Sequence, residues 1–340
     1  MKRTWIIFFL FIPLFCFAQY VNLTDFMKEN NISLQWDTVR DMGVLMSNKN
    51  RAIFKINAPW IILDYNIKLN TPGIIRNKEA VLIPQETALE LQKYFYQSPK
   101  IDDSYRVAAI VIDPGHGGKD PGASMWHTIN GKKVNIIEKD VVLTISLLLY
   151  KMLKKHYPDK SVLLTRTNDT FIALEERPEI ANNLITGHNE AVIYISIHAN
   201  ASPNKKAKGF EVWYLSPSYS RELIEFNTSA YEYSEVISIL NTMKEEEYTW
   251  ESILLAQEIL SSLEKNVGDI TNNRGLKKGE WLVVKKAKMP SILIEVGFLS
   301  NHGEASYLID KTYLQKICNA IYNGVNQFIQ KFEKSKGFTE

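Results

Sequence analysis

Hydrophobic and polar residues alternate differently in two regions of the chain. Between residue 20 and about residue 95, short strand-like stretches are separated by turns at Asn, Gly and Pro, and the last stretch ends in a helical pattern. These stretches are ISLQWDTVRDMGVLMS, RAIFKINAPWIIL and AVLIPQETALEL. The pattern predicts a small β-rich domain over residues 20–98. A polar linker, which we place at 99–106, follows in the stretch SPKIDDSY.

The second region, residues 107–335, alternates apolar runs with helical patterns. The apolar runs are VAAIVI, SVLLT, AVIYISI, FEVWYL, WLVV and SILIEV, and we expect each to form a strand. The clearest helix follows in NIIEKDVVLTISLLLYKMLKKHY, with Asn135 as its expected N-cap, and a last helix is expected over about 311–333. Alternating strands and helices predict an α/β fold with a mostly parallel sheet flanked by helices.

One connection in this second region is much longer than the others. Residues of about 216–250, between FEVWYL and WESILLAQEIL, interrupt the alternation of strands and helices. Connections in α/β domains usually have about 2–6 residues, and much longer ones are usually functional or disordered. We therefore treat this segment as an insertion.

Residues 1–18 have the pattern of a secretory signal peptide. A positive start, MKR, precedes the apolar run TWIIFFLFIPLF, and the small residue Ala18 ends the segment. The run is too short to span a bilayer comfortably, although an uncleaved anchor is the alternative. Lipid attachment at Cys16 is disfavoured because bulky Phe15 precedes it. We expect an exported protein of the periplasm or cell envelope, with no membrane span in the mature chain.

Charge and cysteine content limit the classes of partner and of stabilising bond. Removal of residues 1–18 takes Lys2 and Arg3 from the 40 basic residues and leaves 38, against 38 acidic ones. A neutral chain argues against nucleic acid as a partner, because phosphate binding requires clustered Lys and Arg. Cys318 would be the one remaining cysteine, so no internal disulfide is expected, and its helical context predicts a buried position.

Side chains able to carry chemistry fall at the ends of the expected strands. His116 follows VAAIVID in a glycine-rich loop, His198 ends AVIYISIH, and Glu295 lies at the end of SILIE. Glu138 lies in the first turn of the helix that follows the His116 loop. Because ligands bind outside the carboxyl ends of strands in open α/β sheets, we expect these four side chains to converge.

Two imidazoles and one carboxylate form the donor set of a hydrolytic zinc site. Such a site keeps one position for water, whose pKa the metal lowers to about 7. Glu295 is then placed to act as the general base. The glycines around His116 would allow a tight turn and leave room for a substrate. Each residue also has a structural alternative, because a strand-end histidine often only forms hydrogen bonds and Glu138 would complement the helix dipole.

Five segments resemble, in order, the motifs of the zinc-dependent N-acetylmuramoyl-L-alanine amidases. They are IVIDPGHGGKDPGA, EKDVVL, LTRTND, SIHANA and MPSILIEVGFLSN, and the resemblance covers about residues 107–332. It implies that His116, Glu138 and His198 bind one Zn²⁺ ion and that Glu295 is catalytic. The implied reaction is hydrolysis of the amide between N-acetylmuramic acid and L-alanine in peptidoglycan, by zinc-activated water.

The resemblance also suggests roles for residues outside the metal site. Arg274 matches an arginine of the family and would meet a substrate carboxylate, or else be a surface charge. Asn200 would orient His198 or contact substrate. For Arg166 and Arg177, ion pairs with the scaffold are the favoured interpretation. The other histidines have no partner at ligand spacing and are treated as non-metal residues: His127, His156, His188 and His302.

The insertion resembles the helical segment of the family's cell-division members, which blocks the site until an activator protein displaces it. In AYEYSEVI, Glu232 is the first candidate for an inhibitory zinc ligand and Glu235 the second. A fourth protein ligand would displace the nucleophilic water. The alternative is a solvated acidic helix, because KEEEY shows that the insertion is acidic in general. The β-rich domain weakly resembles the copper amine oxidase N-terminal domain, without a copper site.

Two other functions compete with the amidase interpretation. One is a catalytically idle peptidoglycan-binding or regulatory homologue, which the presence of all four chemical residues disfavours. The other is phosphate binding by GHGGKDPG, which is disfavoured because no Ser or Thr follows Lys119.

Overall fold

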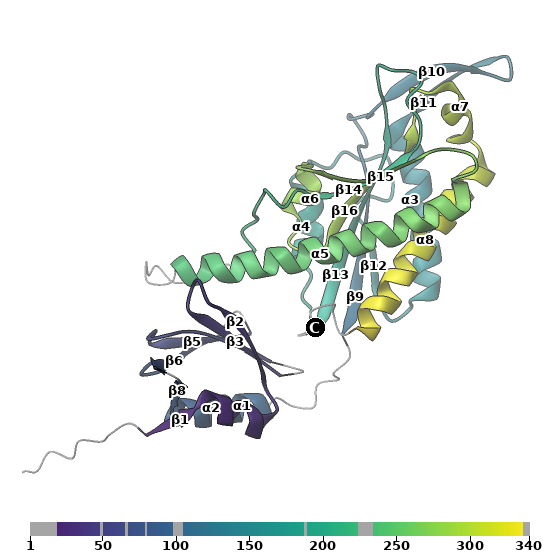
Figure 1. The fold of residues 1–340 in the computed structure, drawn as a ribbon. Coiled ribbons are helices and arrows are strands. Elements are labelled where there is room, and N and C mark those ends of the chain that lie inside the picture. The colour runs from purple at the N-terminus through teal and green to yellow at the C-terminus, as the bar shows by residue number, and fades with distance from the viewer. Residues whose placement is uncertain are drawn as a thin grey trace, which may run out of the picture. The chain divides into compact units, whose positions relative to one another are not determined.

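The chain forms two compact units, Met1–Asp103 and Ser104–Glu340 (Figure 1). This computed structural model describes residues 19–47, 50–64, 67–78, 80–97, 105–186, 189–223 and 234–335; side chains at 234–237, 239 and 240 are not described. The expected signal peptide, residues 1–18, lies outside the described residues.

The first unit is rich in antiparallel strands, as the sequence predicts. Five strands form one sheet in the order β2-β3-β4-β5-β6, and three form another in the order β1-β8-β7. The strands are β1 (Tyr20–Asn22), β2 (Ser33–Asp37), β3 (Met42–Met46), β4 (Arg51–Lys55), β5 (Trp60–Leu63), β6 (Ile67–Asn70), β7 (Ile75–Asn77) and β8 (Ala80–Pro84). The closing helix is α2 (Gln85–Gln97).

The sequence analysis missed one helix of this unit, α1 (Leu23–Asn30). The side chain of Asn22 caps it by accepting a hydrogen bond from the Thr24 amide at 2.8 Å. Leu23 and Phe26 are buried on one face of the helix, in the same core as residues of β4 and β5. The helix is only two turns long, so its periodic signal is weak, and its stability comes from this packing.

The second unit contains a mixed six-stranded sheet in the order β12-β9-β13-β16-β14-β15. Every neighbouring pair is parallel except β14 and β16, which are antiparallel. The predicted mostly parallel sheet is therefore confirmed. The strands are β9 (Arg106–Pro114), β12 (Ser161–Leu164), β13 (Glu190–Asn200), β14 (Phe210–Leu215), β15 (Asn273–Gly279) and β16 (Ser291–Phe298).

Helices cover both faces of this sheet (Figure 1). One core cluster joins the sheet to α3 (Glu138–His156), α5 (Ser234–Val267) and α8 (Lys311–Lys334). A second cluster, on the other face, joins it to α4 (Glu176–Asn182) and α6 (Leu282–Lys286). Cys318 is buried in α8, as its helical context predicts. A hairpin, β10 (Ser124–Ile129) with β11 (Lys132–Ile137), precedes α3, and α7 (His302–Tyr307) follows β16.

Two local predictions for this unit are wrong. Asn135 does not cap α3; it lies in β11 and accepts a hydrogen bond from Ser124, and the helix begins at Glu138. WLVV is not a strand, because Leu282 begins α6 and the sheet uses Asn273–Gly279 instead. Four apolar residues fit a buried strand and a buried helix equally well, and here packing against the second core cluster selects the helix.

The described part of the insertion consists of residues 216–223, which form turns and irregular structure, and residues 234–250, which form the first part of α5. The C-terminal half of α5 is packed in the core and approaches α8 closely, since a Cβ on Gly324 would lie 2.5 Å from the Ile259 Cα. An ion pair between Arg221 and Glu245, 2.7 Å long and buried, joins the start of the insertion to α5. Arg221 also donates to the Ala287 carbonyl. These contacts attach both ends of the insertion to the rest of the second unit.

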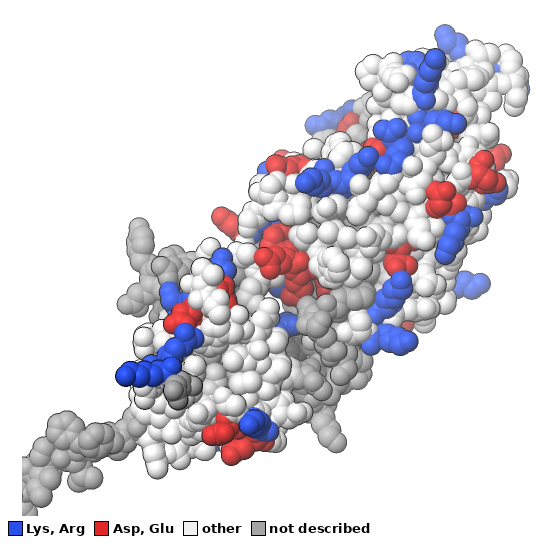
Figure 2. All heavy atoms as spheres, viewed as in Figure 1, with Lys and Arg blue, Asp and Glu red and all other residues white. Residues whose placement is uncertain are grey.

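Acidic and basic side chains are mixed on the molecular face shown in Figure 2. In the described part of the chain, we find no helix that combines the length and apolar character needed to cross a bilayer.

Candidate metal centre

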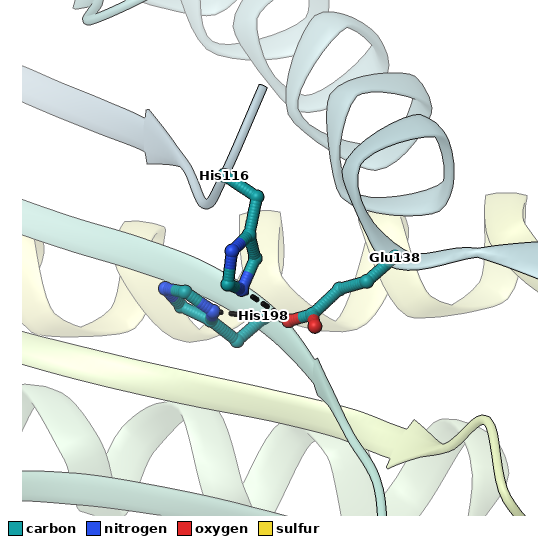
Figure 3. Close-up of side chains that lie close together, drawn as sticks. All are labelled: His116, Glu138 and His198. Atoms are coloured by element: carbon teal, nitrogen blue, oxygen red, sulfur yellow. Dashed lines mark hydrogen bonds and ion pairs between the residues drawn. The ribbon is translucent and has the colours of Figure 1, made fainter. Parts of the chain in front are cut away.

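Three of the predicted ligands come together at one end of the sheet (Figure 3). His116 comes from the loop after β9, Glu138 begins α3, and His198 lies near the end of β13. Their ligand atoms all lie within 4.8 Å of one another. The Glu138 carboxylate oxygen Oε1 lies 3.1 Å from His116 Nε2 and 3.0 Å from His198 Nδ1. Two imidazole nitrogens and a carboxylate oxygen at this spacing fit a divalent transition metal ion.

The His116 loop has an uncommon backbone conformation that buried arginines stabilise. His116 has a φ of 58°, in the left-handed region that non-glycine residues rarely adopt. Arg177 donates to the His116 and Pro114 carbonyls at 2.7 and 2.8 Å, and Arg166 donates to the Gly115 carbonyl at 2.7 Å. These hydrogen bonds offset a conformational cost of about 1–3 kcal/mol. The arginines thus contact the backbone that positions the ligand.

A buried carboxylate completes this support. Asp113 is fully buried and accepts hydrogen bonds from Thr165, Ser196 and Arg177 at 2.6, 2.7 and 3.0 Å. Burial opposes its charge, but Arg177 and the two hydroxyls outweigh this and lower the pKa of Asp113. The charge of Asp113 in turn neutralises Arg177 beneath the metal site. Scaffold ion pairing, the favoured sequence interpretation for Arg177, is what the structure shows.

Glycines in the loop make room for the ligands themselves. A Cβ on Gly115 would lie 2.3 Å from His198, and one on Gly122 would lie 2.5 Å from the Glu138 carboxylate. Gly122 also has a φ of 64°. The sequence analysis assigned these glycines to tight turning and substrate access. The structure adds a more direct reason, because any side chain here would collide with a ligand.

Neighbouring polar groups orient the ligand side chains. Asp120 lies 2.8 Å from His116 Nδ1, which leaves Nε2 facing Glu138. The Ala123 and Ala199 amides donate to the two Glu138 oxygens at 2.8 and 3.1 Å. Burial opposes the charge on His116, but the Glu138 and Asp120 carboxylates outweigh it and raise the pKa of His116. Burial likewise opposes the charge on Glu138, but both histidines outweigh it and lower the pKa of Glu138.

Glu295 lies on β16, directly beside β13, the strand that carries His198. It is the register partner of His198 on parallel β13. Its carboxyl is almost completely buried, and among the described residues Oε2 has no hydrogen-bond partner. Burial raises the pKa of Glu295 well above its ordinary range, and the negative charges of Glu138 and Glu211 add to the effect. A buried carboxyl with one unpaired oxygen and a raised pKa is suited to proton transfer.

Glu211 is a residue of this region that the sequence analysis missed. Its carboxylate accepts from Asn200 at 3.1 Å and from Arg274 at 2.8 Å. Asn200 and Arg274, the two predicted substrate residues, therefore meet on one carboxylate, and the bond of Asn200 is to Glu211, not to His198. The sequence FEVWYL indicated such a residue, because the acidic Glu211 interrupts an apolar run. Its chain neighbours Phe210 and Val212 are both buried.

The remaining candidates lie elsewhere. His127 and His302 are brought together across β10 and α7, with 3.4 Å between their Nδ1 atoms, a proximity that the sequence analysis missed. His156 is the last residue of α3, at the opposite end of the helix from Glu138, and contacts Tyr157 and Tyr322. His188 and Glu232 lie outside the described residues, and the side chain of Glu235 is not described.

The second unit matches a known protein family. The fold and donor set define an α/β protein with a mononuclear metal-type site. The N-acetylmuramoyl-L-alanine amidase family model, Amidase_3, matches residues 110–327, well over half of the chain. The chain belongs to this family. The match lies entirely within the second unit. It includes the three candidate metal ligands and Glu295.

Individual relatives carry the same description. A protein of Buchnera aphidicola subsp. Acyrthosiphon pisum, named as a putative N-acetylmuramoyl-L-alanine amidase, is 32% identical over 239 residues, which are 65% of this chain and 94% of that protein. The amidase AmiA of Escherichia coli is 31% identical over 259 residues, 72% of this chain and 84% of AmiA. The solved structure of AmiC2 of Nostoc punctiforme is 29% identical, with a TM-score of 0.48, and covers 65% of this chain and 97% of its own.

Proposed function

We propose that this protein is a zinc-dependent N-acetylmuramoyl-L-alanine amidase. It hydrolyses the amide between the lactyl group of N-acetylmuramic acid and the L-alanine of the peptide stem in peptidoglycan. The observation that carries the proposal is the convergence of His116, Glu138 and His198 beside a buried Glu295, in a chain of the amidase family.

The donor set supports zinc as the ion. Nitrogen, nitrogen and oxygen donors with an open position are typical of catalytic zinc sites. When bound, the ion polarises the scissile carbonyl and lowers the pKa of water at the site to about 7. The ion would be held by His116, Glu138 and His198. Asp120 orients the His116 ring, and the amides of Ala123 and Ala199 orient the Glu138 carboxylate.

Glu295 performs the proton transfers. Its carboxylate takes a proton from the attacking water, and the resulting acid delivers that proton to the nitrogen of the leaving amine. Burial and the absence of a hydrogen-bond partner at Oε2 among the described residues support this role, because that oxygen is not committed to the scaffold. Ladder hydrogen bonds between β13 and β16 keep Glu295 at a fixed distance from the ligand His198.

The location follows from the substrate. Peptidoglycan lies outside the inner membrane, so the enzyme acts in the periplasm or cell envelope. We further propose that the insertion autoinhibits the enzyme through Glu232, with Glu235 as second candidate, until an activator protein displaces it. The buried Arg221–Glu245 pair supports an insertion attached at both ends, on either side of the segment that contains Glu232.

The test is amide hydrolysis of purified peptidoglycan by the mature chain, residues 19–340, loaded with one equivalent of zinc. Mass spectrometry should detect free stem peptides with an L-alanine amino terminus. Chelation should abolish the release, and added zinc should restore it. A form without the insertion is tested in parallel. If zinc-loaded, folded protein releases no peptide in either form, the enzyme assignment fails and an idle wall-binding homologue is the better description.

A further inference from the structure

Glu211 carries a buried charge, but it is not one of the three candidate metal ligands and it does not itself transfer a proton in the proposed reaction. It lies on β14 directly opposite Glu295 of β16 in antiparallel register, and its side chain is only 3% exposed. Opposite residues of an antiparallel pair face the same side of the sheet. His198, Glu295 and Glu211 therefore form a row across three neighbouring strands at the catalytic end.

Both oxygens of Glu211 are used to hold other side chains. Oε1 accepts from Asn200 Nδ2 at 3.1 Å and from Trp213 Nε1 at 3.2 Å, and Oε2 accepts from Arg274 Nε at 2.8 Å. A buried carboxylate costs free energy unless it is paired in this way. The arrangement fixes three side chains that start from three different strands or strand ends.

Arg274 is only partly committed by this contact. Its Nε donates to Glu211, and we find no acceptor for its two terminal nitrogens among the described residues. The guanidinium lies 4.9 Å from the centre of the Phe298 ring, and the side chain is 38% exposed. Its aliphatic part crosses Gly209, where a Cβ would lie 2.8 Å from the Arg274 Cγ. A planar guanidinium held by Nε presents its two terminal amino groups to solvent as a fork that fits a carboxylate.

An aromatic pair contacts Glu211 through Trp213. Trp213, whose indole nitrogen is bound to Glu211, contacts Trp281 edge to face with 5.5 Å between ring centres. Trp281 is 43% exposed and lies at the N-cap of α6. Trp213 therefore gives the Glu211 carboxylate a further fixed partner beside Asn200 and Arg274.

We propose that Glu211 is a positioning residue: it holds Arg274, for which the family resemblance suggests contact with a substrate carboxylate, in the orientation that binds a carboxylate of the peptide stem. The proposal rests on the function proposed above and adds the class of group recognised, an anionic peptide. Pre-organisation is the physical advantage, because the fork is fixed before substrate arrives and loses less conformational entropy on binding.

Two dipeptide probes separate recognition of the carboxylate from a structural role. N-acetylmuramoyl-L-alanyl-D-glutamate with its γ-carboxyl blocked as a methylamide has one free carboxylate, the α-carboxylate of its second residue. The matching probe, in which the α-carboxyl is a carboxamide and the γ-carboxyl is again a methylamide, has no carboxylate on that residue. Glu211→Gln replaces the carboxylate that holds Arg274 Nε by a neutral amide, so the guanidinium is no longer fixed. Arg274→Gln removes the guanidinium itself. We expect each change to raise KM for the acid probe by about 10- to 100-fold. In Arg274→Gln the expected kcat stays within about twofold of the parent, because the lost contact is remote from the reacting bond. In Glu211→Gln only KM is used as the criterion, because this change also removes a negative charge that helps to raise the pKa of Glu295.

The controls decide the interpretation. KM for the carboxamide probe should change little in either variant, and the zinc content should stay at one ion. Glu190→Gln breaks an exposed ion pair with Arg106 at the opposite end of the sheet and should leave both KM values unchanged. Equal KM increases for the acid and the carboxamide, or a loss of zinc, would show that Glu211 and Arg274 only stabilise the fold.

Direct binding keeps the subsite testable if the proposed activity is absent. Calorimetric titration with the two free dipeptides, L-alanyl-D-glutamate γ-methylamide and the same peptide with an α-carboxamide, requires no hydrolysis. Tighter binding of the acid by the parent, with that preference lost in Arg274→Gln, supports the subsite. Equal affinity for the two peptides in the parent would overturn it.

Discussion

His198 and Glu295 are register partners on adjacent parallel strands, β13 and β16. The main-chain ladder therefore fixes the spacing of the two strands that carry the proposed metal ligand and the carboxyl proposed to transfer protons. Glu295 makes no hydrogen bond through Oε2 among the described residues, so its replacement should disturb chemistry more than structure.

Glu295→Gln should lower kcat by at least about a thousandfold, because the amide cannot accept a proton from water. The zinc content should remain at one ion, since Glu295 is not among the three ligands. Hydrolysis of purified peptidoglycan and metal analysis of the same sample are the two measurements. Activity near that of the parent would remove Glu295 from the mechanism.

Zinc affinity should fall on acidification, beginning above pH 6.5. The pKa of His116 is raised from this value in the metal-free protein, so a proton competes with the ion at a higher pH than for an ordinary histidine. Below that pKa the affinity should decrease by about tenfold per pH unit for one competing proton. Competition with a chromophoric chelator across pH 5.5–8.5, a range set by the ordinary histidine pKa of about 6.5, measures this.

Asp120→Asn provides the matched control for the pH profile. The amide oxygen can still accept from His116 Nδ1, but the negative charge that helps to raise the pKa is gone. The start of the affinity loss should move to lower pH, toward 6.5, and affinity at high pH should drop by about 10- to 100-fold. An unchanged profile would mean that Asp120 does not influence the titration of His116.

Arg177→Ala should destabilise the fold strongly. Arg177 and Asp113 are both almost completely buried and 3.0 Å apart, so the change leaves an unpaired buried carboxylate. We expect a loss of about 3–5 kcal/mol in the free energy of unfolding. Arg106→Ala, which breaks the exposed pair with Glu190, should cost less than about 1 kcal/mol. Urea unfolding curves of both variants compare the two values, and similar losses would contradict the prediction.

Gly122→Ala should impair metal binding. The new Cβ would lie 2.5 Å from the Glu138 carboxylate and 2.7 Å from the His116 ring, at a φ of 64°. Gly131→Ala, at the tip of the β10–β11 hairpin, is the control because its φ is 76° but no atom lies within 4 Å of its Cβ. Both variants have the backbone strain, about 1 kcal/mol, but only Gly122→Ala should lose zinc affinity. Equal zinc content in the two would argue against the steric explanation.

Deletion of residues 218–248 should raise activity on purified cell wall if the insertion inhibits the enzyme. The deletion removes both Arg221 and Glu245, so it leaves no unpaired buried charge from this ion pair. Release of stem peptides is measured beside circular dichroism, which confirms that the variant is folded. A folded variant with unchanged or lower activity would contradict autoinhibition.

Local patterns accounted for much of the fold because they reflect short-range physics. Apolar runs of strand length, a long helix after the His116 loop and the buried face around Cys318 were all predictable from periodicity. WLVV and α1 were not, because a short segment has too few residues to distinguish a helix from a strand, and tertiary packing decides.

The sequence by itself indicated that His116, His198 and Glu295 lie at or after strand ends, and that Glu138 lies in the first turn of the helix after the His116 loop. These are the four candidates for metal binding and proton transfer, because the carboxyl ends of parallel strands share one edge. Only the tertiary structure decided that Asn200, Trp213 and Arg274 meet on Glu211, that Arg177 supports the His116 backbone, and that His127 contacts His302. Such contacts join residues far apart in the chain, and they depend on strand order and register, which periodicity does not encode.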